Sequence, residues 1–250
     1  HGGDVGLAKK MITSAKEAGA DAVKFQTFTA DAFVSRSTPK VLYQKQTTSL
    51  NESHYEMIRK LELKREDHRP LIEYCNELGV DFISTPYDLD SASFLHDAGV
   101  NLFKTASADI VDLLLHEFLA QTGKPVIIST GTATFEEIES AVSLYRSSGS
   151  MQYSLLHCVS NYPCSDNSLN MRVIPMLQSS FRTIVGFSDH SLGNQAAVIA
   201  VALGAKIIEK HFTLDKNMPG PDHRASVTPD EFSELVHSVR RAEIILGTSL

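Results

Sequence analysis

Short apolar runs recur along this chain, and five of them follow a helix-like stretch that ends at a glycine. A glycine just past a helix end supplies the left-handed conformation that caps the helix. A β-branched run directly after it is typical of a buried parallel strand. The five copies cover residues 18–26, 78–85, 98–105, 122–130 and 203–211. This repetition predicts an α/β protein with a parallel sheet, and the polar residues at successive strand ends predict a site at one rim.

Seven strands are predicted in all, at residues 21–26, 81–85, 101–105, 125–130, 153–159, 183–188 and 206–211. Helical patterns lie at residues 7–18, 55–61, 65–78, 91–98, 113–121, 135–147, 171–181, 195–203 and 229–246. Residues 27–52 lack periodicity, and we expect one long polar loop that covers the site. The pattern fits a (β/α)8 barrel without its first strand, with a seven-stranded barrel or an open doubly wound sheet as alternatives. No Gly-x-Gly-x-x-Gly or phosphate-loop lysine motif is present, which weakens the doubly wound alternative.

The composition indicates one globular domain and narrows the classes of partner. Of the 250 residues, 42% are hydrophobic, and the formal net charge is −7. This length suits a single barrel domain, and an acidic chain without a Lys/Arg-rich run argues against nucleic acid as a partner. No membrane is expected, since the longest apolar stretch, residues 196–205, is too short to span a bilayer and no signal peptide opens the sequence. Cys75, Cys158 and Cys164 lack metal-binding spacing, so reduced thiols and a cytoplasmic location are expected.

Charged residues end the last two predicted strands. Glu209 and His211 share one face of their strand because side chains alternate, while Lys210 takes the other face. Residues 188–190, Ser-Asp-His, end the preceding strand. Two histidines on adjacent strand ends, with carboxylates nearby, can hold Mn, Fe, Co or Zn. A buried glutamate hydrogen-bonded to a histidine is the structural alternative, and the residues alone favour the metal only slightly.

Two lysines, Lys24 and Lys104, lie in strand-end segments that are otherwise apolar. Such a lysine is a structural cation at the rim, a Schiff-base former, or a point charge that binds phosphate or carboxylate. Two lysines rather than one favour anion binding. Four serines at the same rim are each explained as turn residues when taken singly, but beside two lysines they indicate a phosphate cradle. They are Ser107, Ser129, Ser160 and Ser188.

The remaining histidines are expected to be structural. His157 follows an apolar strand, and we expect it to fill the top of the core. Five others lie in helix-like stretches and are expected at the surface: His54, His68, His96, His116 and His237. Residues 219–223, Pro-Gly-Pro-Asp-His, form a stiff loop with a carboxylate and an imidazole, which is a weak motif by itself.

Taken in order, these motifs resemble the N-acetylneuraminate (sialic acid) synthase family, which includes legionaminic and pseudaminic acid synthases and spore-coat polysaccharide enzymes. The resemblance runs nearly end to end, through residues 19–27, 84–88, 104–107, 129–131, 157–163, 186–190, 202–215 and 219–223. The family condenses phosphoenolpyruvate with an N-acyl amino sugar on a (β/α)8 barrel, and that fold agrees with the repeats.

The resemblance implies a role for each candidate site residue. His190 and His211 would be the ligands of a divalent metal, typically Mn²⁺, with Mg²⁺ or Co²⁺ as alternatives. Lys24, Lys104, Ser107, Ser129, Ser160 and Ser188 would bind phosphoenolpyruvate. Gln26, Tyr162 and Asp222 would contact the sugar, and Glu209 would be an acid/base or orienting carboxylate beside the metal.

Two departures from the family pattern concern the ends of the chain. The family begins with a strand that carries a glutamate, and this chain starts at His1, after the place of that strand. Members usually also carry a C-terminal antifreeze-like domain that reaches the partner's sugar site in a homodimer, and this chain stops at Leu250. We therefore expect residues 1–250 to be a truncated barrel domain. A barrel aldolase with Lys104 as a Schiff base and a non-catalytic ligand-binding remnant are the alternative functions.

Overall fold

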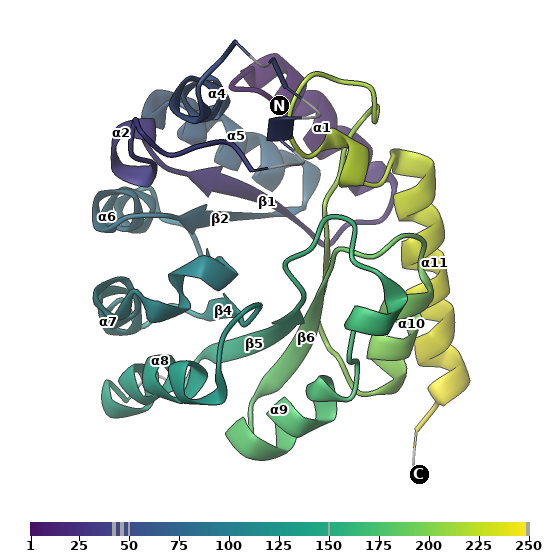
Figure 1. Cartoon of the computed structure of the whole chain (residues 1–250). Coiled ribbons are helices and arrows are strands. Elements are labelled where there is room, and N and C mark those ends of the chain that lie inside the picture. Colours follow the sequence, from purple (N-terminus) through teal and green to yellow (C-terminus); the bar gives the residue numbers. More distant parts are fainter. Residues whose placement is uncertain (42–43, 46–47, 50, 150, 249–250) are drawn as a thin grey trace.

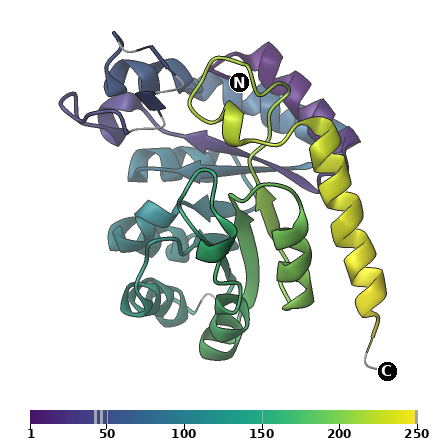
Figure 2. The same cartoon turned by 45° about the vertical axis from the view of Figure 1, so that its right-hand side comes forward.

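The protein folds around one curved sheet of seven parallel strands, in which each strand pairs with its neighbours in sequence. The computed structural model describes residues 1–41, 44–45, 48–49, 51–149 and 151–248. Helices surround the outer face of the sheet (Figures 1 and 2). The strands are β1 (Ala22–Thr27), β2 (Asp81–Pro86), β3 (Phe103–Thr105), β4 (Val126–Ser129), β5 (Tyr153–Cys158), β6 (Ile184–Asp189) and β7 (Ile208–Lys210).

Helices alternate with these strands and return the chain to the same edge of the sheet each time. They are α1 (Val5–Glu17), α2 (Ala30–Phe33), α4 (His54–Leu61), α5 (Arg65–Leu78), α6 (Leu89–Asp97), α7 (Leu113–Gln121), α8 (Phe135–Ser147), α9 (Val173–Phe181), α10 (Gln195–Ala202) and α11 (Pro229–Leu246). Three short 3₁₀ helices are η1 (Ser107–Val111), η2 (Asp166–Ser168) and η3 (His223–Ala225).

Local sequence signals fix where the helices begin and end. Thr134 and Thr228 form capping boxes with Glu137 and Glu231, which satisfy the free N–H groups at the starts of α8 and α11. Gly79 ends α5 in the left-handed conformation, with φ of 63°. Each helix thus ends where the next strand has to begin, and all seven strands run parallel. Their carboxyl ends therefore lie at one rim of the sheet.

Side chains alternate between the two faces of the sheet, and one of these faces packs against the surrounding helices. Phe103, Ile128 and Leu155 are 0% exposed and belong to the core, which also includes side chains of the surrounding helices. Gly186 lies on the opposite face, where an added Cβ would come within 2.4 Å of the Ile207 carbonyl oxygen. Only glycine fits at that close approach of β6 to the chain entering β7.

The structure confirms all seven predicted strands, with bounds shifted by one or two residues. A doubly wound sheet is excluded, because its strand order reverses partway and this sheet runs from β1 to β7 in sequence order. Within the described part of the chain, β1 and β7 are the two ends of that order. A cavity of about 560 Å³ is lined by residues from both of these strands and from α1 and α11.

Two predictions about residues outside the sheet are wrong. The segment 27–52 is not one featureless loop, because α2 forms within it; residues 42–43, 46–47 and 50 of that segment lie outside the described residues. His68 and His116 are 0% exposed and not at the surface. Each has a buried partner: His68 Nε2 lies 2.8 Å from Thr27 Oγ1, and His116 Nδ1 lies 2.9 Å from the Tyr145 hydroxyl.

The prediction for His157 is confirmed. It is 6% exposed, its Nε2 lies 2.6 Å from the Leu169 carbonyl oxygen, and its ring stacks near Phe187. None of the helices that the structure describes has the length and apolar character needed to cross a membrane.

Candidate active site at the rim of the sheet

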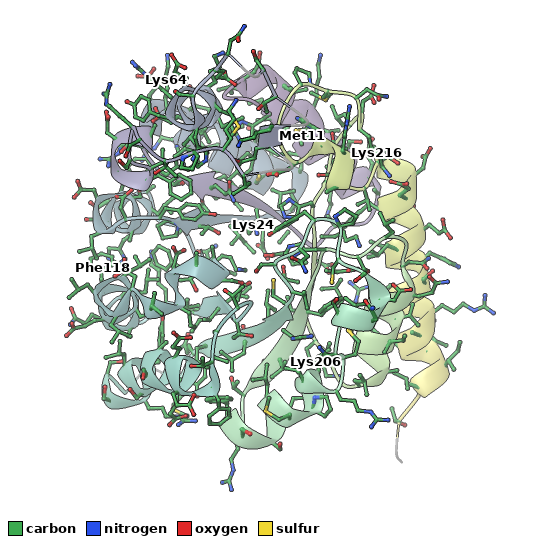
Figure 3. The ribbon with its side chains drawn as sticks, viewed as in Figure 1. Met11, Lys24, Lys64, Phe118, Lys206 and Lys216 are labelled. Carbon is green, nitrogen blue, oxygen red and sulfur yellow. The ribbon has the colours of Figure 1, made fainter. Side chains whose placement is uncertain are left out.

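Two lysines share one carboxylate at the carboxyl ends of the strands. Lys24 Nζ on β1 lies 3.0 Å from Glu209 Oε2 on β7, and Lys104 Nζ on β3 lies 3.9 Å from the same oxygen. Ser188 Oγ, at the end of β6, donates to Glu209 Oε1 at 2.8 Å. Figure 3 shows Lys24 inside the ring of helices, whereas Lys64 lies on the outside. The predicted alternation of Glu209 and Lys210 is confirmed, because Lys210 pairs with a different residue, Asp189.

The charges of this cluster depend on one another. Burial alone would raise the pKa of Glu209, but Lys24 and Lys104 outweigh it and hold that pKa well below its usual range. Burial lowers the pKa of Lys104 to about 8, although Glu209 opposes this shift. Glu209 is therefore ionised at neutral pH, and Lys104 is a cation that can lose its proton just above neutrality.

Three serine hydroxyls surround this cluster and a neighbouring backbone N–H. Lys104 Nζ donates to Ser129 Oγ at 2.6 Å, and the Gly131 N–H donates to Ser107 Oγ at 2.9 Å. A Cβ at Gly131 would lie 2.6 Å from Ser160 Oγ and 2.8 Å from Ser107 Oγ. The absence of a side chain at Gly131 thus leaves a small space between hydroxyl groups. A backbone N–H, hydroxyls and lysines are the donors that bind phosphate oxygens.

The two histidines that follow β6 and β7 lie side by side. The ring centroids of His190 and His211 are 5.3 Å apart, and the Tyr162 ring lies 4.2 Å from His190 and 5.6 Å from His211. His190 Nδ1 lies 2.8 Å from the Val159 carbonyl oxygen and donates its hydrogen to it. The other ring nitrogen, Nε2, then keeps its lone pair and can bind a metal ion. Burial lowers the pKa of His211 to about 3, with Lys24 and His190 adding to the shift, so its imidazole is neutral.

These two imidazoles fit part of a metal site. Among the described residues, no group of three or more His, Cys, Asp or Glu side chains lies close enough to hold a metal ion. The protein would therefore supply two nitrogen ligands, and water or substrate would complete the coordination. His211 offers a neutral imidazole and His190 an imidazole whose Nδ1 is held by an outer hydrogen bond, and both properties suit ligands of a divalent transition metal.

The predicted sugar contacts lie around the same cavity. Gln26, Asp222, Lys24, Lys104, Glu209 and His211 all line it. Gln26 Nε2 donates to the Tyr87 hydroxyl at 2.9 Å and contacts no other predicted site residue among the described hydrogen bonds. Burial raises the pKa of Asp222, although His190 opposes the shift. The structure thus brings predicted residues of β1, β3 and β7 to one cavity. Ser129 and Ser188 are connected to this cavity by their hydrogen bonds to Lys104 and Glu209. His190 and Tyr162 are connected to it by ring contacts with His211.

Sequence reasoning missed one buried thiol in this site. Cys158, the last residue of β5, has its Sγ 3.8 Å from His190 Nδ1 and would lie 3.1 Å from a Cβ at Gly131. Burial would raise its pKa, but hydrogen bonds to His190, Ser107 and Ser188 lower it instead. The signal was available, because Cys158 lies two positions before Ser160 in the predicted strand-end segment, and alternation directs residues two apart to the same side.

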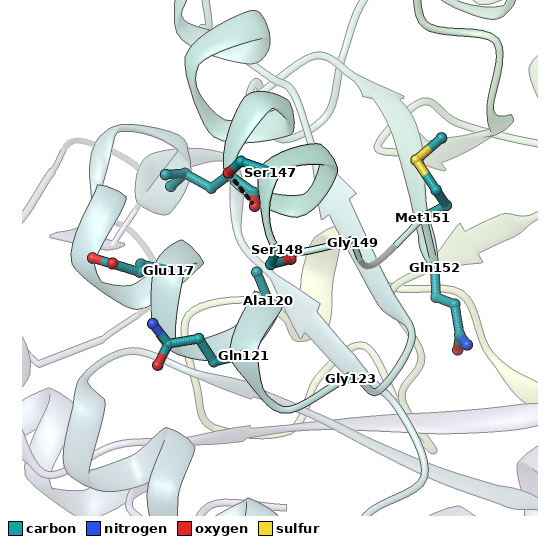
Figure 4. A pocket seen from close by; sticks show the side chains of 10 residues that line it. Glu117, Ala120, Gln121, Gly123, Ser147, Ser148, Gly149, Met151 and Gln152 are labelled. Atoms are coloured by element: carbon teal, nitrogen blue, oxygen red, sulfur yellow. Dashed lines mark hydrogen bonds between the residues drawn. The ribbon is translucent and has the colours of Figure 1, made fainter.

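A second hollow lies away from this rim, between α7 and α8 (Figure 4), and measures about 620 Å³. Its described lining residues include no lysine, arginine or histidine, the groups that make the rim a candidate for anion chemistry. Its lining residues are Glu117, Ala120, Gln121, Gly123, Leu144, Ser147, Ser148, Gly149, Met151 and Gln152.

Comparisons with known proteins identify the family and the fold that this chain shares. The NeuB family profile matches residues 11–250. The N,N'-diacetyllegionaminic acid synthase of Legionella pneumophila is 44% identical over 99% of this chain and 71% of that protein, and its Campylobacter jejuni counterpart is 41% identical over 100% of this chain and 75% of that protein. The crystal structure of the N-acetylneuraminic acid (sialic acid) synthetase of Leptospira borgpetersenii, in complex with citrate, superimposes with a TM-score of 0.90 at 36% identity, covering 100% of this chain and 82% of that one.

Proposed function

Because the chain belongs to the NeuB family, we propose that it condenses phosphoenolpyruvate with an N-acyl amino sugar to give a nonulosonic acid and phosphate. The sugar would be N-acetylmannosamine or a diacetamido sugar. The observation that carries the proposal is the rim cluster in which Lys24 and Lys104 face Glu209, next to the serine hydroxyls and the histidine pair. The names of the relatives support the same substrate class.

The phosphoenolpyruvate would bind where the lysines and serines converge. Lys24 and Lys104 would face its negative oxygens, and the hydroxyls of Ser129 and Ser107 would donate to the phosphate, with Ser107 Oγ itself accepting from the Gly131 N–H. These donors are held by their own hydrogen bonds before the ligand arrives. A preorganised set of donors stabilises phosphate as it gains charge and leaves.

The bond changes fit this placement of charge. The C3 carbon of phosphoenolpyruvate attacks the sugar aldehyde, C2 becomes electron-poor, water adds at C2, and the tetrahedral intermediate releases phosphate. Glu209 lies beside the lysines and, being ionised, would stabilise positive character at C2 and orient the water. A carboxylate with so low a pKa is a weak base, so this orienting role fits better than proton abstraction.

His190 and His211 would hold a divalent metal, Mn²⁺ in the first place and Co²⁺ or Mg²⁺ as alternatives. Bound there, the metal would supply Lewis-acid polarisation of the aldehyde. Gln26, Tyr162 and Asp222 would orient the sugar hydroxyl and amide groups. Burial raises the pKa of Asp222, which favours the protonated carboxyl, the form that can donate a hydrogen bond to the sugar.

Phosphate release tests the proposal. The protein is incubated with phosphoenolpyruvate, Mn²⁺ and N-acetylmannosamine or a diacetamido sugar, beside His190→Ala, His211→Ala and the exposed-site control His237→Ala. We expect metal-dependent release in the parent and in His237→Ala, and loss in the two rim variants. No release with any sugar of the panel, while phosphoenolpyruvate still binds, would favour the ligand-binding remnant over the synthase.

A barrel aldolase is the second candidate, because one observation favours it. Lys104 has a pKa of about 8 in a buried position, as Schiff-base lysines require. Borohydride reduction with a carbonyl substrate would trap an adduct on Lys104 if that chemistry operates. Absence of an adduct in the parent protein removes this candidate.

We also propose that the apolar part of this cavity, between β1 and β7 and apart from its charged rim, is the place of an eighth strand, which would close the barrel. The cavity is lined by Val23 of β1, Ile208 of β7, Ile12 of α1 and Val236 of α11, so its walls are apolar on several sides. Adding an apolar strand segment upstream of His1 should raise the melting temperature, and no rise would count against the closed barrel. The family resemblance supports a homodimer of the full-length protein, and the free cysteines Cys75, Cys158 and Cys164 support a cytoplasmic location.

A further inference from the structure

A buried ion pair joins the ends of β6 and β7, the two strands that His190 and His211 follow. Asp189 ends β6 and Lys210 ends β7, and the two residues are direct partners in the parallel register. Lys210 Nζ lies 2.8 Å from Asp189 Oδ2, and the side chains are 2% and 0% exposed. His190 and His211 follow immediately in the sequence. The ion pair therefore lies one residue away from both imidazoles.

Alternation places this pair on the face of the sheet opposite to the rim cluster. Ser188 and Glu209, one residue earlier on each strand, meet on the inner face through their 2.8 Å hydrogen bond. The same two strands are thus linked twice at their ends, once on each face. An effect of Asp189 and Lys210 on the site has to pass through the backbone of residues 189–190 and 210–211.

Hydrogen bonds extend from the pair into the turn after His190. Asp189 Oδ1 accepts from the Ser191 N–H at 2.8 Å and from Ser191 Oγ at 2.6 Å. Lys210 Nζ donates to the Ser191 carbonyl oxygen at 2.5 Å and lies 3.5 Å from that of Gly193. The Cys164 N–H donates to the His190 carbonyl oxygen at 2.8 Å. The backbone on both sides of His190 is consequently fixed relative to the end of β7.

We propose that Asp189 and Lys210 are a positioning pair that sets the separation and orientation of His190 and His211. The inference rests on the proposed function, because it takes the two histidines as metal ligands. Two charges without contact with water are costly unless geometry and hydrogen bonding are both good, and here each polar atom of the pair has a partner. Groups that orient metal ligands from outside change metal affinity by about 10- to 100-fold when removed.

Metal binding tests the proposal without relying on turnover. Mn²⁺ is titrated into the parent protein and into Asp189→Asn/Lys210→Met, which keeps the volume and leaves no unpaired buried charge, and binding is followed by calorimetry and by the EPR spectrum of the bound ion. We expect at least tenfold weaker binding in the double variant. The control is Leu177→Ala in α9, a fully buried position in the hydrophobic core that makes no contact described for the site, and we expect it to bind Mn²⁺ within twofold of the parent despite its lower melting temperature.

The outcomes separate this proposal from the proposed function. Parent-like Mn²⁺ affinity and EPR spectrum in the folded double variant overturn the positioning pair and leave the metal site standing. If the double variant does not fold, Asp189→Asn/Lys210→Gln, which also leaves no unpaired buried charge and lets two amides bond to each other, decides by the same criterion. A parent protein that binds no Mn²⁺, or a His190→Ala variant that binds it equally well, removes the two-histidine metal site and the positioning pair with it.

Discussion

Removing the carboxylate of Glu209 should destabilise the fold and should increase the stabilisation that a bound anion provides. Glu209→Gln keeps the size of the side chain but leaves Lys24 and Lys104 facing each other without a negative charge. Breaking a buried ion pair on one side costs about 3–5 kcal/mol. Since Glu209 is 21% and Lys24 27% exposed, we expect the lower end, about 3 kcal/mol at pH 7. For a chain of this size that corresponds to a fall of roughly 6–12 °C in melting temperature.

The assay is thermal unfolding with and without inorganic phosphate or phosphoenolpyruvate. An anion in the rim would replace the missing charge, so its stabilising effect should be larger in Glu209→Gln than in the parent. A saturating ligand at about 100 times its Kd adds about 2.7 kcal/mol, which is enough to restore most of the loss. Glu231→Gln breaks the partly exposed pair with Lys216 and serves as the control, with an expected loss of about 1 kcal/mol or less. A Glu209→Gln variant as stable as the parent, or equal anion effects in both, would refute the reasoning.

Three further predictions concern single residues. Gly131→Ala should weaken phosphate binding about tenfold or more in calorimetry, with an unchanged circular dichroism spectrum, because its Cβ would lie 2.6 Å from Ser160 Oγ. Phosphoenolpyruvate affinity should fall as the pH rises through about 8, where Lys104 loses its proton, and Lys104→Arg should remove that step from the titration. Burial lowers the pKa of His116 to about 4, so as the pH falls the unfolded chain takes up this proton before the folded protein does. About 3 kcal/mol of stability that is present above pH 6.5 should therefore be lost between pH 6.5 and 4. In urea unfolding at a series of pH values, His116→Gln should lose less stability over that range than the parent.

Periodicity predicted the sheet well because buried parallel strands have a strong local signal. The run ending at Glu209 shows this: glycine after a helix, then apolar residues, then polar ones, and the structure has β7 there. The ends of β3 and β7 shifted inward because only the residues that pair with neighbours count as strand. The short helix α2 was missed because four residues are too few for a 3.6-residue period to show.

The site was predictable as a location, but its contacts were not. Strand ends of parallel neighbours meet at one rim, so Lys24, Lys104 and Glu209 could be expected near one another. Nothing in the sequence says that both lysines contact the same carboxylate oxygen, because that depends on how far the sheet curves between β1 and β7. The surface assignment of His68 and His116 failed for a related reason: in a helix, burial of one face depends on what packs against it, and here tertiary hydrogen bonds use the imidazoles.

The net charge of the chain conceals the charge of the site. The sequence carries −7, yet at the rim Lys24 and Lys104 both lie within 4 Å of the carboxylate of Glu209, so two positive charges face one negative charge there. At a short separation and in a partly dry cavity, these neighbours outweigh distant acidic residues, which salt screens beyond about 10 Å. Before a ligand binds, Glu209 neutralises part of the positive charge of the two lysines. A bound phosphate therefore competes with Glu209 for the same two ammonium groups. Affinity for the anion is therefore limited by Glu209 itself, and a variant that lacks this carboxylate should bind phosphate more tightly while catalysing less.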